Sequence, residues 1–289
     1  MPARLILNAD DFGLTRGINR AIAELHSAGA ISSATLMASG AAFDDAIAVA
    51  RAHPSLDVGC HIVLTDGAPV SPPSSIRSLI GADGKNFRPS LVDFVQALLF
   101  GRINEEEVSR EALAQIEKLQ RAGIRPTHID THKHTHLFPS IARPLLQVAE
   151  RCGIRAIRNP FEPGWSLALN HGSRARRFAV RLIGCLRPRF EAHAQLRDGR
   201  VLTTDGTVAI SATGELNATT LGEILRVLPP TGTYEICCHP GYNDGELDCV
   251  ITRLRAQRDI EREALLSEIP RVLAGPNAPS LLLYGSLAE

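Results

Sequence analysis

The segment from His128 to His136 carries the strongest chemical signal in the chain. It reads HIDTHKHTH, so four of the ten histidines alternate within nine residues. Imidazole nitrogens are favoured ligands of zinc and similar divalent ions. On a strand, this alternation would place all four histidines on one face. Some of them could bind a metal while others support the ligands or contact a substrate. A polar loop that merely contains histidine is the alternative.

Two adjacent acids, Asp10 and Asp11, stand in the motif NADDFG after the first apolar run. Adjacent residues of a strand point to opposite sides of the chain. One carboxylate could therefore bind a metal while the other faces a bound water. A simple turn is the competing interpretation, because Asp and Gly are common turn residues.

Three further candidates lie near predicted strand ends. His61 stands in GCHIVLT, and His239 stands in CCHPGY, where the Pro-Gly turn would expose its imidazole. Arg158 ends the run IRAIR and could orient a carboxylate. By spacing alone, a buried structural histidine is the commoner role for a residue like His61, and a surface position is preferred for Arg158.

Short apolar runs alternate with amphipathic stretches along the chain, which predicts alternating strands and helices. The predicted strands are 4–8, 31–37, 57–64, 127–131, 154–158, 233–239 and 280–284. The predicted helices are 15–28, 42–52, a helix that Asn104 caps and Gly123 ends, 140–151, 219–228 and 248–269. A loop rich in Pro, Gly and Ser occupies 67–90.

This alternation predicts a mainly parallel sheet with helices outside it. A (β/α) barrel is favoured over an open doubly wound sheet, because the candidate side chains follow several separate strands, where barrel active sites lie. Periodicity does not show closure, so the open sheet stays as the alternative. Neither nucleotide-binding glycine motif is found. No linker or repeat divides the chain, which predicts a single domain over 1–289.

Composition limits the partners. The formal net charge is zero, so no nucleic-acid partner is predicted. No stretch approaches the roughly 18 apolar residues of a membrane-spanning helix, and the N-terminal apolar run is too short for a signal peptide. A cytoplasmic location follows by default. The six cysteines have neither metal-type spacing nor the density of a disulfide framework. A homodimer is left open.

Together, NADDFG, GCHIVLT, PTHIDTHKHTHLFP and CCHPGY resemble the YdjC/ChbG/HpnK family of carbohydrate deacetylases. Each motif alone is weak, but the four occur in the family's order from about residue 4 to the final strand. The resemblance implies a distorted, TIM-like (β/α) barrel in one domain, related to the NodB-type polysaccharide deacetylases. The segment 165–215 departs most from the family pattern.

The resemblance also implies roles for individual residues. Metal binding falls to one carboxylate and two imidazoles, those of Asp11, His61 and His132. Asp10 matches the general base and His239 the general acid. Arg158 stands in a place like that of the arginine that holds the base, although its flanking residues match less well.

The implied reaction is removal of the acetyl group from an N-acetylated sugar or glycolipid, which gives acetate and a free amine. One divalent ion would suffice, zinc or magnesium first, with cobalt, nickel or manganese as alternatives. No organic cofactor is needed. The native metal and the sugar are not fixed by the sequence, nor are the roles of His128, Asp130, His134 and His136.

Three other functions use the same residues. Two histidines and an aspartate also form the facial triad of non-haem Fe(II) oxygenases, and His128-x-Asp130 fits that spacing. Those enzymes usually have a jelly-roll fold. A metal hydrolase of another type could use His132-x-His134, but would need further ligands on later strands. A non-catalytic metal- or sugar-binding protein would not need Asp10 beside a ligand.

The segment from Arg174 to Arg200 suggests a membrane contact. It holds eight arginines against two acids, a net charge of +6 in a neutral protein, with apolar residues between them. A basic amphipathic helix can lie on an anionic membrane surface, which would suit a glycolipid substrate. The alternative is an ordinary solvated helix whose apolar side packs on the core.

Overall fold

The computed structural model describes residues 3–288, and a parallel sheet forms its centre. The sheet has the order β5-β4-β3-β2-β1-β7-β6, and the short β8 also pairs with β1. Each of these strand pairs is parallel. The strands are β1 (Arg4–Phe12), β2 (Ser33–Leu36), β3 (Asp57–Ile62), β4 (His128–Thr131), β5 (Ala156–Ile157), β6 (Gly206–Val208), β7 (Thr233–Cys238) and β8 (Ser280–Leu281).

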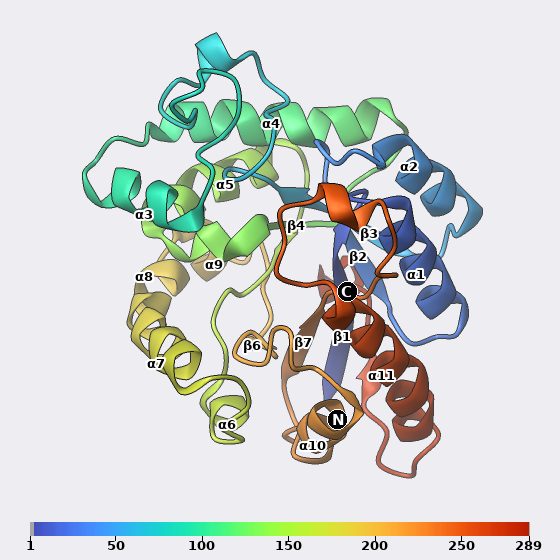
Figure 1. The fold of residues 1–289 in the computed structure, drawn as a ribbon. Helices are drawn as coiled ribbons and strands as arrows, with labels where there is room; N and C mark the ends of the chain where they lie inside the picture. The colour runs from blue at the N-terminus through green and yellow to red at the C-terminus, as the bar shows by residue number, and fades with distance from the viewer. Residues whose placement is uncertain (1–2, 289) are drawn as a thin grey trace.

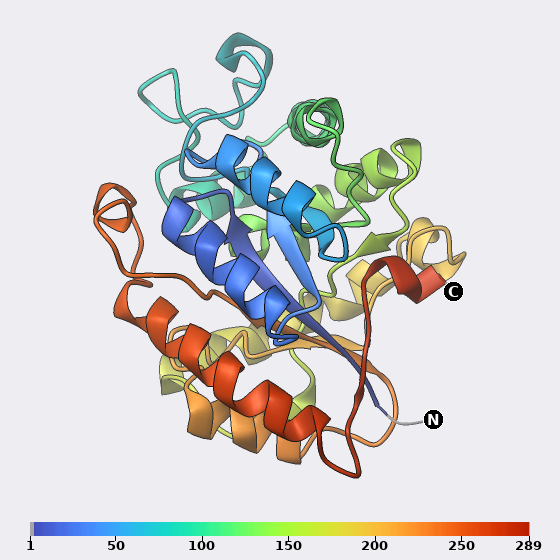
Figure 2. The same ribbon diagram turned by 90° about the vertical axis from the view of Figure 1, so that its right-hand side faces the viewer.

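Helices surround this curved sheet on its outer side (Figure 1). They are α1 (Arg16–Ser27), α2 (Phe43–Ala52), α3 (Leu91–Leu99), α4 (Glu105–Arg121), α5 (Pro139–Arg151), α6 (Gly164–Leu167), α7 (Arg174–Ile183), α8 (Arg187–Glu191), α9 (Ala194–Arg197), α10 (Ala218–Arg226) and α11 (Ala256–Leu273). Figure 2 shows α2, α1 and α11 side by side along one outer face.

The sheet forms a half-barrel, which confirms the predicted barrel-like class. Its two end strands, β5 and β6, do not pair with each other among the residues described. The backbone between them bridges part of the gap, because Leu202 pairs with Ala156 and the N–H of Thr207 donates to the carbonyl of Phe161. The connection from β5 to β6 contains α6 to α9, which lie together beside this opening (Figure 1).

Local sequence explains why the longer helices begin and end where they do. The side chain of Asn104 accepts from the N–H groups of Glu106 and Glu107, which caps α4. Thr15 caps α1 in the same way through the N–H of Ile18. Gly123, with φ of 87°, follows α4 in the left-handed conformation that glycine adopts without strain.

The two sides of the sheet differ in polarity. Leu7 and Ala9 of β1 belong to the apolar core. Asn8 and Asp10, which alternate with them, point into a polar network inside the half-barrel. Glu235 of β7 contacts the same network through Arg158. The interior of the half-barrel is therefore built for ionic chemistry, while the apolar core lies between strands and helices.

Several predicted boundaries are wrong. The first strand, expected over 4–8, continues to Phe12. The helix expected over 248–269 begins only at Ala256, because the side chains of Thr252 and Gln257 accept from the backbone N–H groups of Leu254 and Arg255. The last strand, expected over 280–284, ends at Leu281. The predicted loop 67–90 contains one short helical turn, Pro73–Ser75.

Candidate metal centre and active site

A bulge near the end of β1 brings both acids of NADDFG to one place. Ala9 pairs with Ala34 and Phe12 with Leu36, so β1 holds one extra residue here. Asp11 has a φ of 64°, in the left-handed region where non-glycine residues are uncommon. The expectation that the two carboxylates point to opposite sides is wrong for this reason. Each places an oxygen within 4.8 Å of a ring nitrogen of His61.

Asp11, His61 and His132 place three donor atoms in a small triangle. Oδ1 of Asp11 lies 3.7 Å from Nε2 of His61 and 3.4 Å from Nδ1 of His132, and the two nitrogens lie 3.3 Å apart. Ligands bound about 2.0–2.1 Å from a tetrahedral ion are about 3.4 Å from one another. Oδ1 of Asp11 is buried and has no hydrogen-bond partner among residues 3–288. The residues therefore fit a divalent cation.

Asp130 supports His61 from behind. Its Oδ1 lies 2.7 Å from Nδ1 of His61, which leaves Nε2 free to face the triangle. Burial alone would lower the pKa of His61, but the charge and hydrogen bond of Asp130 outweigh it and raise the pKa to about 9. Without a metal, a proton stabilised by the neighbouring acids occupies this ring, and a cation would replace it.

Arg158 is fully buried against three acids. Its guanidinium donates to both oxygens of Asp10, at 2.8 and 2.6 Å, and also pairs with Asp130 and Glu235. The surface position preferred from spacing is therefore wrong. Burial alone would raise the pKa of Asp10, but Arg158 holds that pKa well below its usual range. Asp10 is consequently a carboxylate in a fixed orientation.

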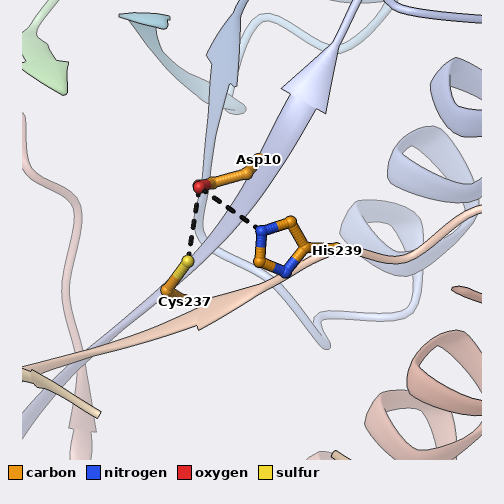
Figure 3. A group of neighbouring side chains, drawn as sticks. All are labelled: Asp10, Cys237 and His239. Atoms are coloured by element: carbon orange, nitrogen blue, oxygen red, sulfur yellow. Dashed lines mark hydrogen bonds and ion pairs between the residues drawn. The ribbon is translucent and has the colours of Figure 1, made fainter. Parts of the chain in front are cut away.

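His239, which directly follows β7, faces Asp10 on the neighbouring strand β1 (Figure 3). Its Nε2 lies 3.8 Å from Oδ2 of Asp10, and Sγ of Cys237 donates to the same oxygen at 3.3 Å. These three residues could geometrically hold a metal. Burial raises the pKa of the Cys237 thiol well above its usual range, so it stays protonated. Asp10 is also already paired with the guanidinium of Arg158. The group of Asp10, Cys237 and His239 therefore suits proton transfer better than metal binding.

The other three histidines of the HIDTHKHTH segment diverge. β4 ends at Thr131, and Lys133 and His134 have positive φ values, so the alternation does not persist on one face. His128 stacks on Tyr284 and hydrogen-bonds to Asn8. His136 lies between the Thr131 hydroxyl and the carbonyl of Arg158. None of the three joins the triangle.

A cavity of about 280 Å³ lies beside the loop that follows His132. Lys133 and His134 line it, together with Phe161 and apolar residues of α7. His132 and His239 are the exposed members of the site, with 21% and 14% of their side chains accessible, whereas Asp10, Asp11 and His61 are almost fully covered. A substrate would reach the buried acids from the side of these two histidines.

A family model for YdjC-like proteins matches residues 4–273. The chain belongs to this family. The predicted resemblance is therefore confirmed. Among its relatives, a carbohydrate deacetylase of Brevibacillus brevis is 42% identical over 147 residues, which are 51% of this chain and 56% of that protein. A mouse carbohydrate deacetylase is 32% identical over 248 residues, 83% of this chain and 78% of that protein.

The match covers little more than half the length of the Brevibacillus relative and of one from Geobacillus stearothermophilus, 56% and 58%. A solved structure from Enterococcus faecalis, named for a proposed cellobiose-phosphate cleavage activity, covers 100% of both chains with a TM-score of 0.78 and 27% identity. Within residues 3–288, the helices lack the length and apolar character needed to cross a membrane.

Glu235, which pairs with Arg158, and two residues of α11 at this YdjC-like site were not predicted. Arg258 and Glu261, both on α11, are buried at the site. Arg258 donates to Oδ2 of Asp11 at 2.6 Å, and Glu261 accepts from the backbone N–H of His239 at 2.6 Å. In the sequence they stand in RDIERE, a charged stretch typical of a solvated helix face. Their spacing of three residues, which places them on one side of a helix, is the only signal that links them.

Proposed function

We propose that this protein, as a single domain, is a metal-dependent deacetylase of N-acetylated amino sugars. The observation that carries the proposal is the adjacency of two groups at the same strand ends. One is the donor triangle of Asp11, His61 and His132, and the other is the Asp10–His239 pair. The name carbohydrate deacetylase, which several relatives bear, supports the same reaction.

The donor triangle would hold one divalent ion. Two imidazoles and a carboxylate favour zinc over magnesium, which prefers oxygen ligands, while cobalt, nickel and manganese remain usable. A bound ion would polarise the acetyl carbonyl and lower the pKa of the attacking water from about 15.7 to about 7. Asp130 keeps the free nitrogen of His61 directed at the ion through its hydrogen bond to Nδ1.

Asp10 and His239 supply the proton transfers. Asp10 stays ionised because Arg158 pairs with both of its oxygens, so it can accept the proton of the attacking water. His239 lies beside Asp10 and is partly exposed, and it would donate a proton to the departing sugar amine. The products are acetate and an amino sugar.

A side-by-side acetate assay tests this function. The full chain is stripped with a chelator, reloaded with Zn²⁺ or Mg²⁺, and offered N-acetylated chito-oligosaccharides and N-acetylglucosaminyl lipids. We expect acetate release only after reloading. Release that persists in the stripped protein would refute metal dependence, and no release from any N-acetylated sugar would refute the deacetylase function.

We further propose that the substrate reaches the site from a membrane surface. On α7, Phe178 and Leu182 are 70% and 62% exposed, and they stand at helical spacing with Arg174 and Arg181. No residue of α7 is buried, so these side chains do not pack on the core as in an ordinary surface helix. The opposite side of α7 lines the cavity beside His134. An apolar and basic face directed outward suits an anionic lipid surface.

A further inference from the structure

Arg258 is a buried cation whose position demands an explanation. Its side chain is 1% exposed, and it comes from α11, 247 residues away from its partner Asp11. Removing a charge from water is unfavourable unless the charge is paired and hydrogen-bonded. Among residues 3–288, Asp11 is the one acid within ion-pair distance of Arg258. Nε of the guanidinium also donates to the carbonyl of Leu254, and Nη1 donates to that of His239.

The contact with Arg258 gives the two oxygens of Asp11 different surroundings. Oδ2 accepts from Arg258 at 2.6 Å, whereas Oδ1 has no hydrogen-bond partner in the described part of the chain. It is Oδ1 that lies 3.7 Å from His61 and 3.4 Å from His132. One oxygen is therefore held by the protein, and the other is left free toward the two imidazoles.

We propose that Arg258 is a positioning residue that makes Asp11 a one-oxygen ligand of the metal centre. The inference rests on the proposed metal site. With Arg258 in place, the carboxylate cannot turn both oxygens toward the ion without breaking a charged hydrogen bond.

A purely structural role, in which Arg258 only attaches α11 to the rest of the fold, does not explain its contact with Asp11. The helix already packs on the core through Ala264, Leu265 and Ile269. Arg262, one turn after Arg258, binds Glu24 and packs over the ring of Tyr242. That contact ties α11 to α1 without touching the site. Arg262 is therefore a matched control for a purely structural role.

The test compares Arg258→Met, Arg258→Lys and Arg262→Met in the full chain. Zn²⁺ affinity is measured by calorimetry on the metal-free proteins, and visible absorption is recorded after loading with Co²⁺. We expect Arg258→Met to weaken Zn²⁺ binding about 10–100-fold, as loss of a group that orients a ligand does. Its Co²⁺ bands should weaken, because a second carboxylate oxygen raises the coordination number. Arg258→Lys should recover part of both properties.

Arg262→Met should keep the affinity and the Co²⁺ spectrum of the wild type even if its melting temperature falls. If Arg258→Met binds Zn²⁺ as tightly as the wild type with an unchanged Co²⁺ spectrum, the positioning role is refuted and the proposed function stands. If the wild type itself binds neither ion, the metal site and this inference both fail. Should Arg258→Met not fold, Arg258→Gln takes its place, because its shorter, neutral side chain cannot reach Oδ2 of Asp11 as the guanidinium does. A wild-type affinity and Co²⁺ spectrum in Arg258→Gln then refute the inference.

Discussion

Oδ1 of Asp130 lies 2.7 Å from Nδ1 of His61, and this contact directs Nε2 of the same ring toward Asp11 and His132. Asp130 also pairs with Arg158, which in turn holds Asp10. One carboxylate therefore supports both the donor triangle and the orientation of the proposed base. Groups behind a metal ligand fix its tautomer and strengthen its binding.

Replacing Asp130 should weaken the metal centre without removing a ligand. We expect Asp130→Asn to reduce metal affinity about 10–100-fold, and His61→Ala or His132→Ala to abolish stoichiometric binding. Metal content after dialysis measures both effects, and His134→Ala, outside the triangle, is the control. Full occupancy and activity in His61→Ala or His132→Ala would show that the proposed ligand set is wrong.

Substitutions of the adjacent residues Asp10 and Asp11 should impair different properties, turnover in one case and metal binding in the other. Asp10→Asn should keep the metal and lose about 10²–10⁴ in kcat, because it removes a proton acceptor. Asp11→Asn should lower metal affinity itself, because it removes a charged ligand. Metal analysis and kcat, measured together on both variants, separate the two roles. Equal metal contents and equal rates would refute the distinction.

His239 should matter only when the leaving group needs a proton. We expect His239→Ala to reduce kcat on an N-acetyl amide far more than on an activated acetate ester, whose leaving group departs as an anion. Glu261→Gln keeps an acceptor for the backbone N–H of His239, so its activity should stay within a few fold of the wild type. Equal losses on both substrates in His239→Ala would indicate a structural role.

Three histidines with lowered pKa values should make stability depend on pH. Burial lowers the pKa of His128 and His136 to about 4 and that of His134 to about 3, against about 6.5 in an unfolded chain. At pH values between the folded and the unfolded pKa, the unfolded state therefore binds more protons than the folded state. The stabilisation that comes from keeping these histidines neutral is fully present above about pH 6.5. As the pH falls toward 4, the free energy of unfolding decreases by up to about 1.4 kcal/mol per pH unit for each histidine.

Chemical denaturation of the metal-free protein at about pH 7 and about pH 5 measures this slope. His128→Gln should reduce the slope relative to that of the wild type. The raised pKa of His61 acts in the opposite sense as the pH rises above about 6.5, but this effect is the same in the wild type and in His128→Gln, so it cancels when the two slopes are compared. A His128→Gln slope equal to that of the wild type would contradict the assignment.

The sequence predicts those parts of the fold that local signals define. α4 was predicted from its cap Asn104 and from Gly123, and β4 was placed within one residue. By contrast, α3, α6, α8 and α9 were not predicted as separate helices, and α7 was expected only as part of a basic helical segment within 174–200. The helices α6, α8 and α9 are only four or five residues long, which is too short to show a helical repeat in the sequence.

In the candidate site, too, the sequence predicts some features and not others. Asp11, His61 and His132 stand at strand ends, and strand ends meet at one rim of a parallel sheet, so their adjacency follows from the fold class. The bulge at Asp11 is a tertiary feature that no residue pattern indicated. The contact between Arg258 and Asp11 joins residues 247 positions apart, and a charged helix turn carries no sign of such a partner.

The exposed face of α7 should bind anionic membranes. We expect the wild type to sediment with vesicles of anionic lipid at low salt and to be released at high salt, because screening weakens the attraction of Arg174 and Arg181. Phe178→Ser with Leu182→Ser should abolish sedimentation without changing kcat on a soluble N-acetyl sugar, because both side chains point into solvent. Ile251→Ser, at an equally exposed position outside α7, is the control and should sediment normally. A wild type that never sediments would refute the membrane contact and favour soluble oligosaccharides as substrates.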